Sequence, residues 1–409
     1  MDFTDTPEEA EYRAHVRAWL DANAEKRTPG AVFKAAYGSD DLVPLAKEWQ
    51  AKKCEAGFAG ITWPKEYGGQ GDGQMRQVIY NQEEAEYVTP RGVYEIGLGM
   101  CLPTMLTYAT EEQKQRYAPP ALRGEEIWCQ LFSEPAAGSD VAGLRTRCER
   151  DGDDWIINGQ KIWTSGAHFS DFGVIVTRSD PSQPKHKGLT YFFLDMKSPG
   201  IECRRIKQIS GTSNFNEVFF DNVRVPDSQR LGGVGDGWRV AITTLMNERL
   251  AVGQTPAPDF WEAFAVAKDV ELEDGPAIRD SAVREKLADW YVQMMGLKWG
   301  RFRTMTALSR GEQPGPEASI TKIVSANKRQ QIASFALDLM DVGGALYDAK
   351  QAPLQAMFQE ALLSSPSGRI AGGTDEILRN IIAERVLGMP PEIRVDKDAP
   401  FDQLPRGGA

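Results

Sequence analysis

The spacing of hydrophobic positions divides this chain of 409 residues into a helical part, a part rich in strands and a second helical part. In the first part, Tyr12, Val16 and Leu20 recur on one face, as in an amphipathic helix. The preceding Thr6-Pro7-Glu8-Glu9 is a capping-box pattern with proline at the first helical position, so a helix is predicted to begin there. Helices are predicted at residues 7–22, 42–56, 74–88 and 111–122.

The pattern changes near Trp128, where apolar and polar residues begin to alternate and turn residues become frequent. Alternation at period two indicates strands with one buried face. Asn158-Gly159 stands between two apolar runs, and it predicts a tight hairpin because both central residues of a type I′ turn need positive φ. Further strands are predicted at residues 172–177, 189–195 and 216–220. Together these signals indicate an antiparallel β-domain of about 100 residues.

The helical period returns after the glycine-rich stretch 232–237. Helices are predicted at residues 237–252, 281–310, 316–340 and 375–387. The expected fold class is therefore α+β. Its predicted parts are an N-terminal helical domain (1–125), a middle antiparallel β-domain (126–231), a C-terminal helical bundle (232–389) and an extended tail (390–409).

Composition and charge exclude several classes of protein. Lys plus Arg is 47 and Asp plus Glu is 58, and the resulting net charge of −11 disfavours binding to nucleic acid. No apolar run approaches the roughly 18 residues of a membrane span, and the first residues lack the pattern of a secretion signal. The five cysteines form no C-x-x-C pair and there are only three histidines, so no metal site is expected. Scattered cysteines of this kind suggest a cytoplasmic location.

Two segments of the middle domain carry residues suited to a planar or phosphorylated ligand. The first, Gln130–Asp140, combines hydroxyls with small residues that let a ligand approach the backbone. The alternative is a structural loop capped by Ser133 and Asp140. The second, Lys161–Gly166, places an aromatic ring before two hydroxyl residues, which suits stacking on a ring and donation to its edge. The alternative places Trp163 in the core and the hydroxyls in a turn. The sequence contains no G-x-G-x-x-G or P-loop pattern.

Two further segments lie in the C-terminal part. Glu248 stands on a helix face with Ala241, Leu245 and Val252, all of them apolar. A buried glutamate is costly unless paired, and desolvation raises its pKa toward the range useful for a general base. The alternative is an ion pair with Arg249. In residues 369–380, two glycines precede a helix that Thr374 can cap, an arrangement that admits a ligand phosphate or simply starts a helix.

Taken in this order, the segments resemble the acyl-CoA dehydrogenase family over about residues 5–390. The resemblance rests on the stretches Ser133–Asp140, Ile157–Gly166, Phe220–Pro226, Met340–Gly344 and Gly372–Thr374. It implies a helical–β–helical fold, FAD as cofactor, an acyl-CoA thioester as substrate and an electron-transfer flavoprotein as electron acceptor. It also implies a homotetramer or heterotetramer built on the C-terminal helices.

The resemblance assigns roles to the residues at matching positions. Trp163 would stack near the isoalloxazine ring, with Thr164 and Ser165 donating hydrogen bonds to its reactive edge. The full set of expected FAD contacts is Gln130, Phe132, Ser133, Trp163, Thr164, Ser165, Gly343, Gly344, Thr374 and Glu376. The expected contacts to the CoA ester are Ser139, Leu245 and Arg249. The reaction implied is removal of a Cα proton and transfer of a Cβ hydride to flavin N5, which leaves an α,β-double bond.

The sequence departs from the commonest family pattern at the base and at the cofactor clamp. Many members place a glutamate directly before Gly-Thr in the C-terminal loop, where this chain has Gly372. Glu248 is therefore the expected base, at a position similar to that in isovaleryl and long-chain dehydrogenases. An Arg-x-x-Phe-Gly motif is missing from residues 254–280, and Met340 replaces a usual glutamine.

With these departures and the stretch Pro314–Ser319, the chain resembles bacterial members that act on bulky or steroid side-chain CoA esters. Some of those members pair with a second, non-identical subunit. Two alternatives to an active dehydrogenase stay open at this point. One is a non-catalytic partner subunit of a heterotetramer, and the other is a flavin oxidase or monooxygenase of the same fold.

Overall fold

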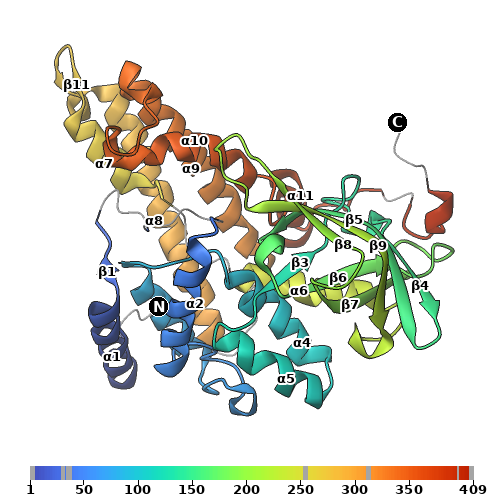
Figure 1. Cartoon of the computed structure of the whole chain (residues 1–409). Coiled ribbons are helices and arrows are strands. Elements are labelled where there is room, and N and C mark those ends of the chain that lie inside the picture. Colours follow the sequence, from blue (N-terminus) through green and yellow to red (C-terminus); the bar gives the residue numbers. More distant parts are fainter. Residues whose placement is uncertain are drawn as a thin grey trace. The chain divides into compact units, whose positions relative to one another are not determined.

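The computed structural model describes residues 5–28, 33, 39–251, 257–309, 315–393 and 396–404. The side chains of residues 248–251, 305, 308, 309 and 318 lie outside this description. The chain divides into two compact units, which Figure 1 shows with their elements labelled. The helical unit contains Met1–Lys34, Gly73–Thr89 and Gly253–Pro391. The sheet unit contains Ala35–Asp72, Pro90–Val252 and Glu392–Ala409.

The helical unit is built from α-helices, with short strands and single helical turns between them (Figure 1). Its elements in chain order are α1 (Pro7–Asn23), β1 (Glu25–Lys26), α3 (Gln74–Glu84), β2 (Tyr87–Val88), α7 (Phe260–Asp269), β11 (Glu271–Leu272), β12 (Gly275–Pro276), η6 (Ala277–Arg279), α8 (Ser281–Ser309), η7 (Pro316–Ala318), α9 (Ser319–Leu339), η8 (Asp341–Ala345), η9 (Pro353–Ala356), α10 (Met357–Gly368), α11 (Asp375–Ile381) and the π-helical η10 (Ile382–Val386). Helices α7 to α10 share one apolar core that includes Phe260, Trp290, Ile332 and Phe358.

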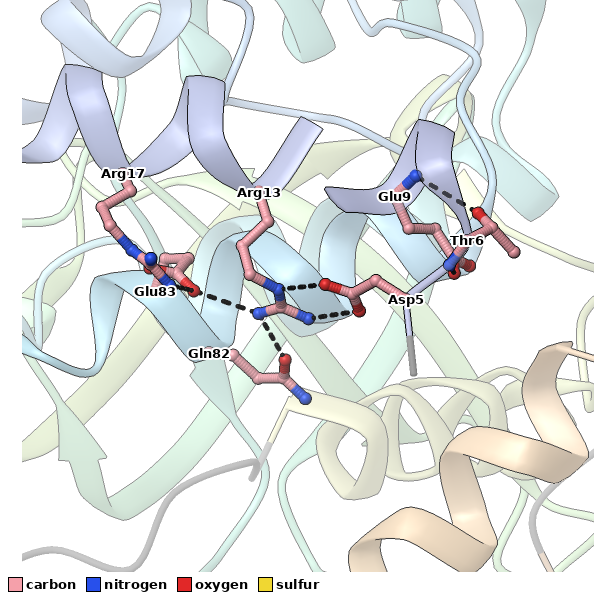
Figure 2. A network of polar contacts seen from close by, with 7 residues as sticks. All are labelled: Asp5, Thr6, Glu9, Arg13, Arg17, Gln82 and Glu83. Carbon is pink, nitrogen blue, oxygen red and sulfur yellow. Dashed lines mark hydrogen bonds and ion pairs between the residues drawn. The ribbon is translucent and has the colours of Figure 1, made fainter. Parts of the chain in front are cut away.

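Local sequence explains where α1 begins and what holds it. Thr6 Oγ1 accepts a hydrogen bond from the amide of Glu9, and the Glu9 carboxylate accepts one from the amide of Thr6, so the predicted capping box is confirmed. Figure 2 shows this end of α1 together with Arg13 and Arg17, which both donate to Glu83 of α3. Two guanidinium groups on one carboxylate tie the first helix to the third.

The sheet unit combines a large sheet with helices that precede and follow it in the chain. Its elements are α2 (Leu42–Glu55), η1 (Lys65–Tyr67), the π-helical η2 (Gly97–Cys101), α4 (Leu102–Tyr108), α5 (Glu111–Leu122), β3 (Trp128–Leu131), η3 (Val141–Gly143), β4 (Arg147–Asp151), β5 (Asp154–Ser165), η4 (Ala167–Phe169), β6 (Phe172–Arg178), β7 (Leu189–Asp195), β8 (Ile201–Ile206), β9 (Phe215–Pro226), η5 (Asp227–Gln229), β10 (Arg230–Leu231), α6 (Gly237–Ala251) and η11 (Phe401–Gln403).

The strands of the large sheet follow the order β10-β7-β6-β4-β5-β9-β8, and β3 pairs with β6 outside this path. Most pairs are antiparallel, as predicted, but β3 and β4 each run parallel to β6. The longest pairing joins β5 to β9 and runs from the Asp154–Pro226 pair to the Ser165–Phe215 pair. The α+β fold class is confirmed, whereas the domain boundaries given above stay a prediction.

The hairpin predicted at Asn158-Gly159 is wrong, because both residues lie inside β5. The chain instead turns at Gly152, which has a φ of 64°, between β4 and β5. The β5–β9 register shifts between Ile157 and Gly159. Gly159 has a φ of 150°, and a Cβ there would lie 2.6 Å from Thr146 Oγ1. The glycine therefore permits a close approach between neighbouring segments, and not a turn.

Two apolar cores use opposite faces of the sheet. Along β6, Val174 and Val176 join the core that includes residues of α4, α5 and α6, whereas Ile175 joins the second core. This alternation follows from the period of two along a strand. A Cβ on Gly237 would lie 2.6 Å from the carbonyl carbon of Leu189, so a glycine is needed where α6 begins against β7.

Candidate functional site

A buried ion pair joins the two candidate segments of the sheet unit. Lys161 Nζ lies 2.9 Å from Glu134 Oε1, and the Lys161 side chain is fully buried. Lys161 also donates to the Phe132 carbonyl oxygen over 3.0 Å. The second carboxylate oxygen of Glu134 accepts from the amide of Arg145, and the first also accepts from the amide of Thr146.

The charge on Glu134 is fixed by these donors. Burial raises the pKa of Glu134, but Lys161, Thr146 and the amide of Arg145 outweigh burial and hold that pKa below its ordinary value of 4.5. Glu134 is therefore ionised at neutral pH. The buried ion pair therefore holds the two segments together.

A backbone hydrogen bond also joins these two segments. The amide of Ile162 donates to the Ser133 carbonyl oxygen over 2.9 Å. The next residue, Trp163, lies where the β5–β9 register shifts, and it has a φ of 59°. An irregular strand of this kind redirects a side chain, and the Trp163 ring is 55% exposed. The alternative that placed Trp163 in the core is therefore wrong, although the ring contacts Phe215 edge-on.

Thr164 follows Trp163 in β5 and is held through its backbone. Its carbonyl oxygen accepts a hydrogen bond from Asn216 Nδ2 over 2.9 Å, and Asn216 is fully buried in β9. The hydroxyl of Thr164 is buried and has no hydrogen-bond partner within the described part of the chain. A buried hydroxyl without a partner is costly, and a ligand atom would satisfy it. Neighbouring Ser165 is half-buried.

The amide oxygen of Asn216 is held by His168. His168 Nδ1 lies 3.1 Å from Asn216 Oδ1. Because Asn216 uses its amide nitrogen to donate to Thr164, its oxygen accepts here, and Nδ1 of the histidine carries the proton. Burial and the nearby Arg205 lower the pKa of His168 below 6.5. The histidine is thus neutral at pH 7 and fixes the orientation of the amide.

Helix α6 is fixed to the sheet by a cluster of buried hydroxyl groups. Thr244 Oγ1 lies 2.9 Å from both the Tyr191 hydroxyl and Thr104 Oγ1. Tyr191 in turn contacts the ring of Phe132 edge-on. Leu245 is half-buried and packs against the core that contains Phe132. A defined set of contacts therefore connects Phe132 to the middle of α6.

The predicted base lies on this helix, one turn beyond Thr244. The backbone of Glu248 and Arg249 is helical, and their side chains lie outside the described residues. Neither the catalytic role of Glu248 nor its alternative, an ion pair with Arg249, is tested by the geometry.

Ser139, one of the predicted contacts to the CoA ester, is exposed, and Asp140 makes no side-chain cap for η3. The capped-loop alternative therefore fails at Asp140.

The remaining predicted FAD contacts belong to the helical unit. Gly344 is buried in η8, where a Cβ would lie 2.4 Å from the Leu337 carbonyl oxygen, whereas Gly343 is exposed. Thr374 Oγ1 accepts from the amide of Ile377, so Thr374 caps α11 as predicted. Glu376 is exposed in the first turn. The role of these residues in cofactor binding stays a prediction.

Asp375 lies in this region and was not among the predicted site residues. It is buried and accepts hydrogen bonds from Arg369 over 2.8 Å and from Asn327 over 3.1 Å. Burial raises the pKa of Asp375, but these donors outweigh it and leave the pKa below 3.8.

The predicted site residues also did not include Glu134, Asn216 and Thr244. The sequence could have indicated that Glu134 and Lys161 are paired, because a charged residue within a run of apolar and small residues needs a partner when it is buried.

The sheet-unit residues fit a flavin ring. Trp163 offers an exposed aromatic face, Thr164 offers a buried hydroxyl without a partner, and Ser165 follows directly. Gln130 and Ser133 are half-buried on the connected segment. Aromatic surface beside several hydrogen-bonding groups suits a planar ring with polar edge atoms. Within the described part of the chain, no cluster of His, Cys, Asp or Glu is placed to hold a metal ion.

Comparison with known proteins gives the same family for all three parts of the chain. Models of the acyl-CoA dehydrogenase N-terminal, middle and C-terminal domains match residues 6–125, 129–223 and 235–387. The chain is 35% identical to acyl-CoA dehydrogenase IpdE1 of Mycobacterium tuberculosis over 387 residues, which cover 94% of this chain and 98% of that protein. It therefore belongs to the acyl-CoA dehydrogenase family, whose members are flavoprotein oxidoreductases.

One further relative is a longer protein, and two similar proteins have solved structures. Acyl-CoA dehydrogenase FadE34 of Mycobacterium tuberculosis is 39% identical over 358 residues, which cover 87% of this chain but only 48% of that protein. The chain thus spans about half the length of FadE34. The structure of the Tcur3481-Tcur3483 steroid ACAD matches with a TM-score of 0.77 and 27% identity, covering 96% of this chain and 100% of that chain. The ChsE4-ChsE5 complex from Mycobacterium tuberculosis matches with a TM-score of 0.75 and 25% identity, covering 96% and 100%.

Proposed function

We propose that this protein is an FAD-dependent dehydrogenase that forms an α,β-double bond in an acyl-CoA thioester. The observation that carries the proposal is the pairing of an exposed Trp163 ring with the buried, unpartnered hydroxyl of Thr164 on one connected strand. When bound, FAD supplies the acceptor for a hydride from the substrate Cβ. The protein residues orient the ring, exclude water and remove a proton.

In this proposal, Trp163 covers the flavin, and Thr164 and Ser165 donate hydrogen bonds to its edge. The same side of the flavin is lined by Gln130, Phe132 and Ser133, which the buried Lys161–Glu134 ion pair holds in place. Gly343, Gly344, Thr374 and Glu376 would contact the adenosine and pyrophosphate parts of FAD. Ser139, Leu245 and Arg249 would border the CoA part of the substrate.

The proposed base is Glu248, which takes the Cα proton on its carboxylate. Support comes from its position one turn beyond Thr244 on a helix that hydroxyl contacts fix to β7 and α4. Gly372 occupies the alternative position for a base in the C-terminal loop and has no side chain to accept a proton. A positioned base contributes about 10²–10⁴-fold to rate.

The relatives suggest a substrate class and a partner. One similar structure is described as a steroid ACAD and another as a complex of two named chains. We therefore propose a bulky or steroid side-chain CoA ester as substrate and assembly as a homotetramer or heterotetramer. An electron-transfer flavoprotein is the proposed electron acceptor. Among the described residues, no helix has the length and hydrophobicity that crossing a bilayer requires.

The test is anaerobic reduction of the purified flavoprotein by straight, branched and steroid side-chain CoA esters, followed as loss of flavin absorbance. Glu248→Gln should keep its flavin but lose bleaching by about 10²–10⁴-fold in rate. Glu112→Gln, which changes an exposed glutamate of α5, is the matched control. Normal bleaching in Glu248→Gln would remove Glu248 from the mechanism.

The same preparation separates the two alternative functions. A chain that neither carries nor takes up flavin would be a non-catalytic partner subunit. Rapid reoxidation of the substrate-reduced flavin by O₂ would indicate an oxidase or monooxygenase.

A further inference from the structure

The last described segment of the chain, residues 396–404, packs against the sheet unit beyond β6. The amide of Phe401 donates to the Gln183 carbonyl oxygen, and the amide of Asp402 donates to that of Pro181, each over 3.0 Å. Pro400 forms a β-bridge with Pro184. In Figure 1 this segment, in red, lies beside the sheet. Backbone pairing of this kind fixes both the position and the register of the segment, here called the tail strap.

A buried arginine connects the tail strap to the segment that follows Ser139. Arg178 ends β6, and its guanidinium lies 3.7 Å from the centroid of the Phe401 ring. The same guanidinium donates to the carbonyl oxygens of Ala142 and Leu144. Burial lowers the pKa of Arg178 to about 10, so the group stays charged at neutral pH. The Phe401 ring supplies a cation–π contact where the described residues provide no carboxylate within ion-pair distance.

A lysine makes a second connection to the same segment. Lys185 Nζ lies 2.6 Å from Asp396 Oδ2 in the tail strap and 3.0 Å from Asp140 Oδ2. The Lys185 side chain is mostly buried, and the two carboxylates outweigh burial and raise its pKa. One ammonium group thus joins the tail strap to the residue next to Ser139. Charge-assisted hydrogen bonds of this type are among the stronger polar contacts in proteins.

These contacts converge on residues 139–144, which carry Ser139, the proposed contact to the CoA part of the substrate. Asp140 is held at one end of this segment, and the Ala142 and Leu144 carbonyls are held at the other. Both holding groups, Lys185 and Arg178, are themselves in contact with the tail strap.

We propose that the tail strap positions residues 139–144 for binding of the CoA ester, acting through Lys185 and Arg178. This inference rests on the proposed function only for the identity of the ligand. Lys185 is a positioning residue in this scheme, because it acts through Asp140. The tail strap therefore contributes to substrate affinity although it lies about 250 residues away in sequence from the segment that it holds.

The test uses full-length variants, each compared with a conservative partner. Lys185→Met and Asp396→Asn break the ion pairs, and Phe401→Ala removes the ring over Arg178. Lys185→Arg and Phe401→Tyr retain the charge and the ring. Lys197→Met is the control, because it breaks an exposed ion pair with Asp171 elsewhere in the sheet unit.

The first readout is hydrogen–deuterium exchange without any ligand. The amides of Gly143 and Leu144 donate to the carbonyls of Asp140 and Val141, so they report on the order of this segment. We expect their exchange to be at least about threefold faster in Lys185→Met, Asp396→Asn and Phe401→Ala. The conservative variants and Lys197→Met should exchange like the wild type. Unchanged exchange in all three disruptive variants would overturn the proposal.

The second readout is the KM of the CoA ester against kcat. KM should rise about three- to tenfold in the disruptive variants, with kcat within about twofold, and Lys185→Arg should restore KM. A lower melting temperature with unchanged KM would show a merely structural strap and contradict the proposal. If no CoA ester reduces the wild-type flavin, the proposed function fails, and exchange at Gly143 and Leu144 still decides whether the tail strap holds this segment.

Discussion

Lys161 Nζ lies 2.9 Å from Glu134 Oε1, and both side chains are buried although the two residues are 27 positions apart in the sequence. Removing one partner of a buried ion pair leaves the other charge without compensation. The pair therefore contributes to stability in a way that depends on both residues being present. It also holds Phe132 and Ser133 beside the strand that carries Trp163.

Lys161→Met is expected to lower the free energy of unfolding by about 3–5 kcal/mol. The physical reason is that Glu134 would stay buried with only its backbone donors. Lys161→Met combined with Glu134→Gln should recover part of this loss, because no buried charge then lacks a partner, although one amide oxygen replaces the two carboxylate oxygens that accept separately from Arg145 and Thr146. Denaturant unfolding of the wild type, Lys161→Met and the double variant tests this. A double variant no more stable than Lys161→Met would show that the charge on Glu134 is not the cause.

Trp163→Ala is expected to weaken flavin retention with little change in stability. The ring is 55% exposed, so its truncation removes little buried apolar surface from the protein itself. Trp261→Ala is the matched control, because Trp261 is 56% exposed on α7 in the helical unit. Flavin-to-protein ratios after gel filtration and melting temperatures give the two readouts. Equal flavin content in both variants would show that Trp163 does not stack on the cofactor.

Thr244→Val is expected to destabilise the protein by about 1–3 kcal/mol and to slow flavin reduction. The change keeps the shape but leaves the Tyr191 hydroxyl and Thr104 Oγ1 without their shared partner, Thr244 Oγ1. Because Glu248 follows one turn later, loosening of α6 should lower kcat more than it raises KM. Thr107→Val, on the exposed face of α4, provides the control. An effect on KM alone would indicate that α6 shapes the substrate site and does not position the base.

Local sequence signals predicted the starts of α1, α5 and α11, because capping is decided within one turn, but they did not predict α4, α7 or α10. Thr6 and Thr374 each cap the helix predicted from them. The hairpin predicted from Asn158-Gly159 was wrong because a glycine can serve two different structural purposes. It permits a positive φ in a turn, and it also permits a close contact, as Gly159 does with Thr146.

The candidate site was predicted in its parts but not in its connections. The residues around Trp163 were found from a motif, whereas the Lys161–Glu134 pair and the Asn216–Thr164 bond join positions far apart in sequence. Such contacts depend on strand order and register, which one sequence does not specify. The tail beyond residue 390 was predicted to be extended, and nothing in its own pattern indicated that Phe401 would cover Arg178.

The α1–α3 contact in the helical unit gives a prediction about pH. Glu83 is buried and accepts hydrogen bonds from Arg13 over 3.1 Å and from Arg17 over 2.9 Å (Figure 2). Burial raises the pKa of Glu83, but the two guanidinium groups outweigh it and leave the pKa below 4.5. A carboxylate whose pKa is lower in the folded state adds stability above its unfolded value, and this stability is lost as the pH falls through the folded value.

Glu83→Gln should therefore lower the stability by about 1–3 kcal/mol at neutral pH, since the neutral amide cannot pair with Arg13 and Arg17. The difference from the wild type should shrink as the pH falls below 4.5, because wild-type Glu83 then takes up a proton as well. Melting temperatures of both proteins between about pH 7 and pH 3 measure this difference. Glu86→Gln, an exposed position three residues further along, should melt like the wild type throughout. A difference that stays constant down to the lowest pH would mean that Glu83 acts through packing and not through its charge.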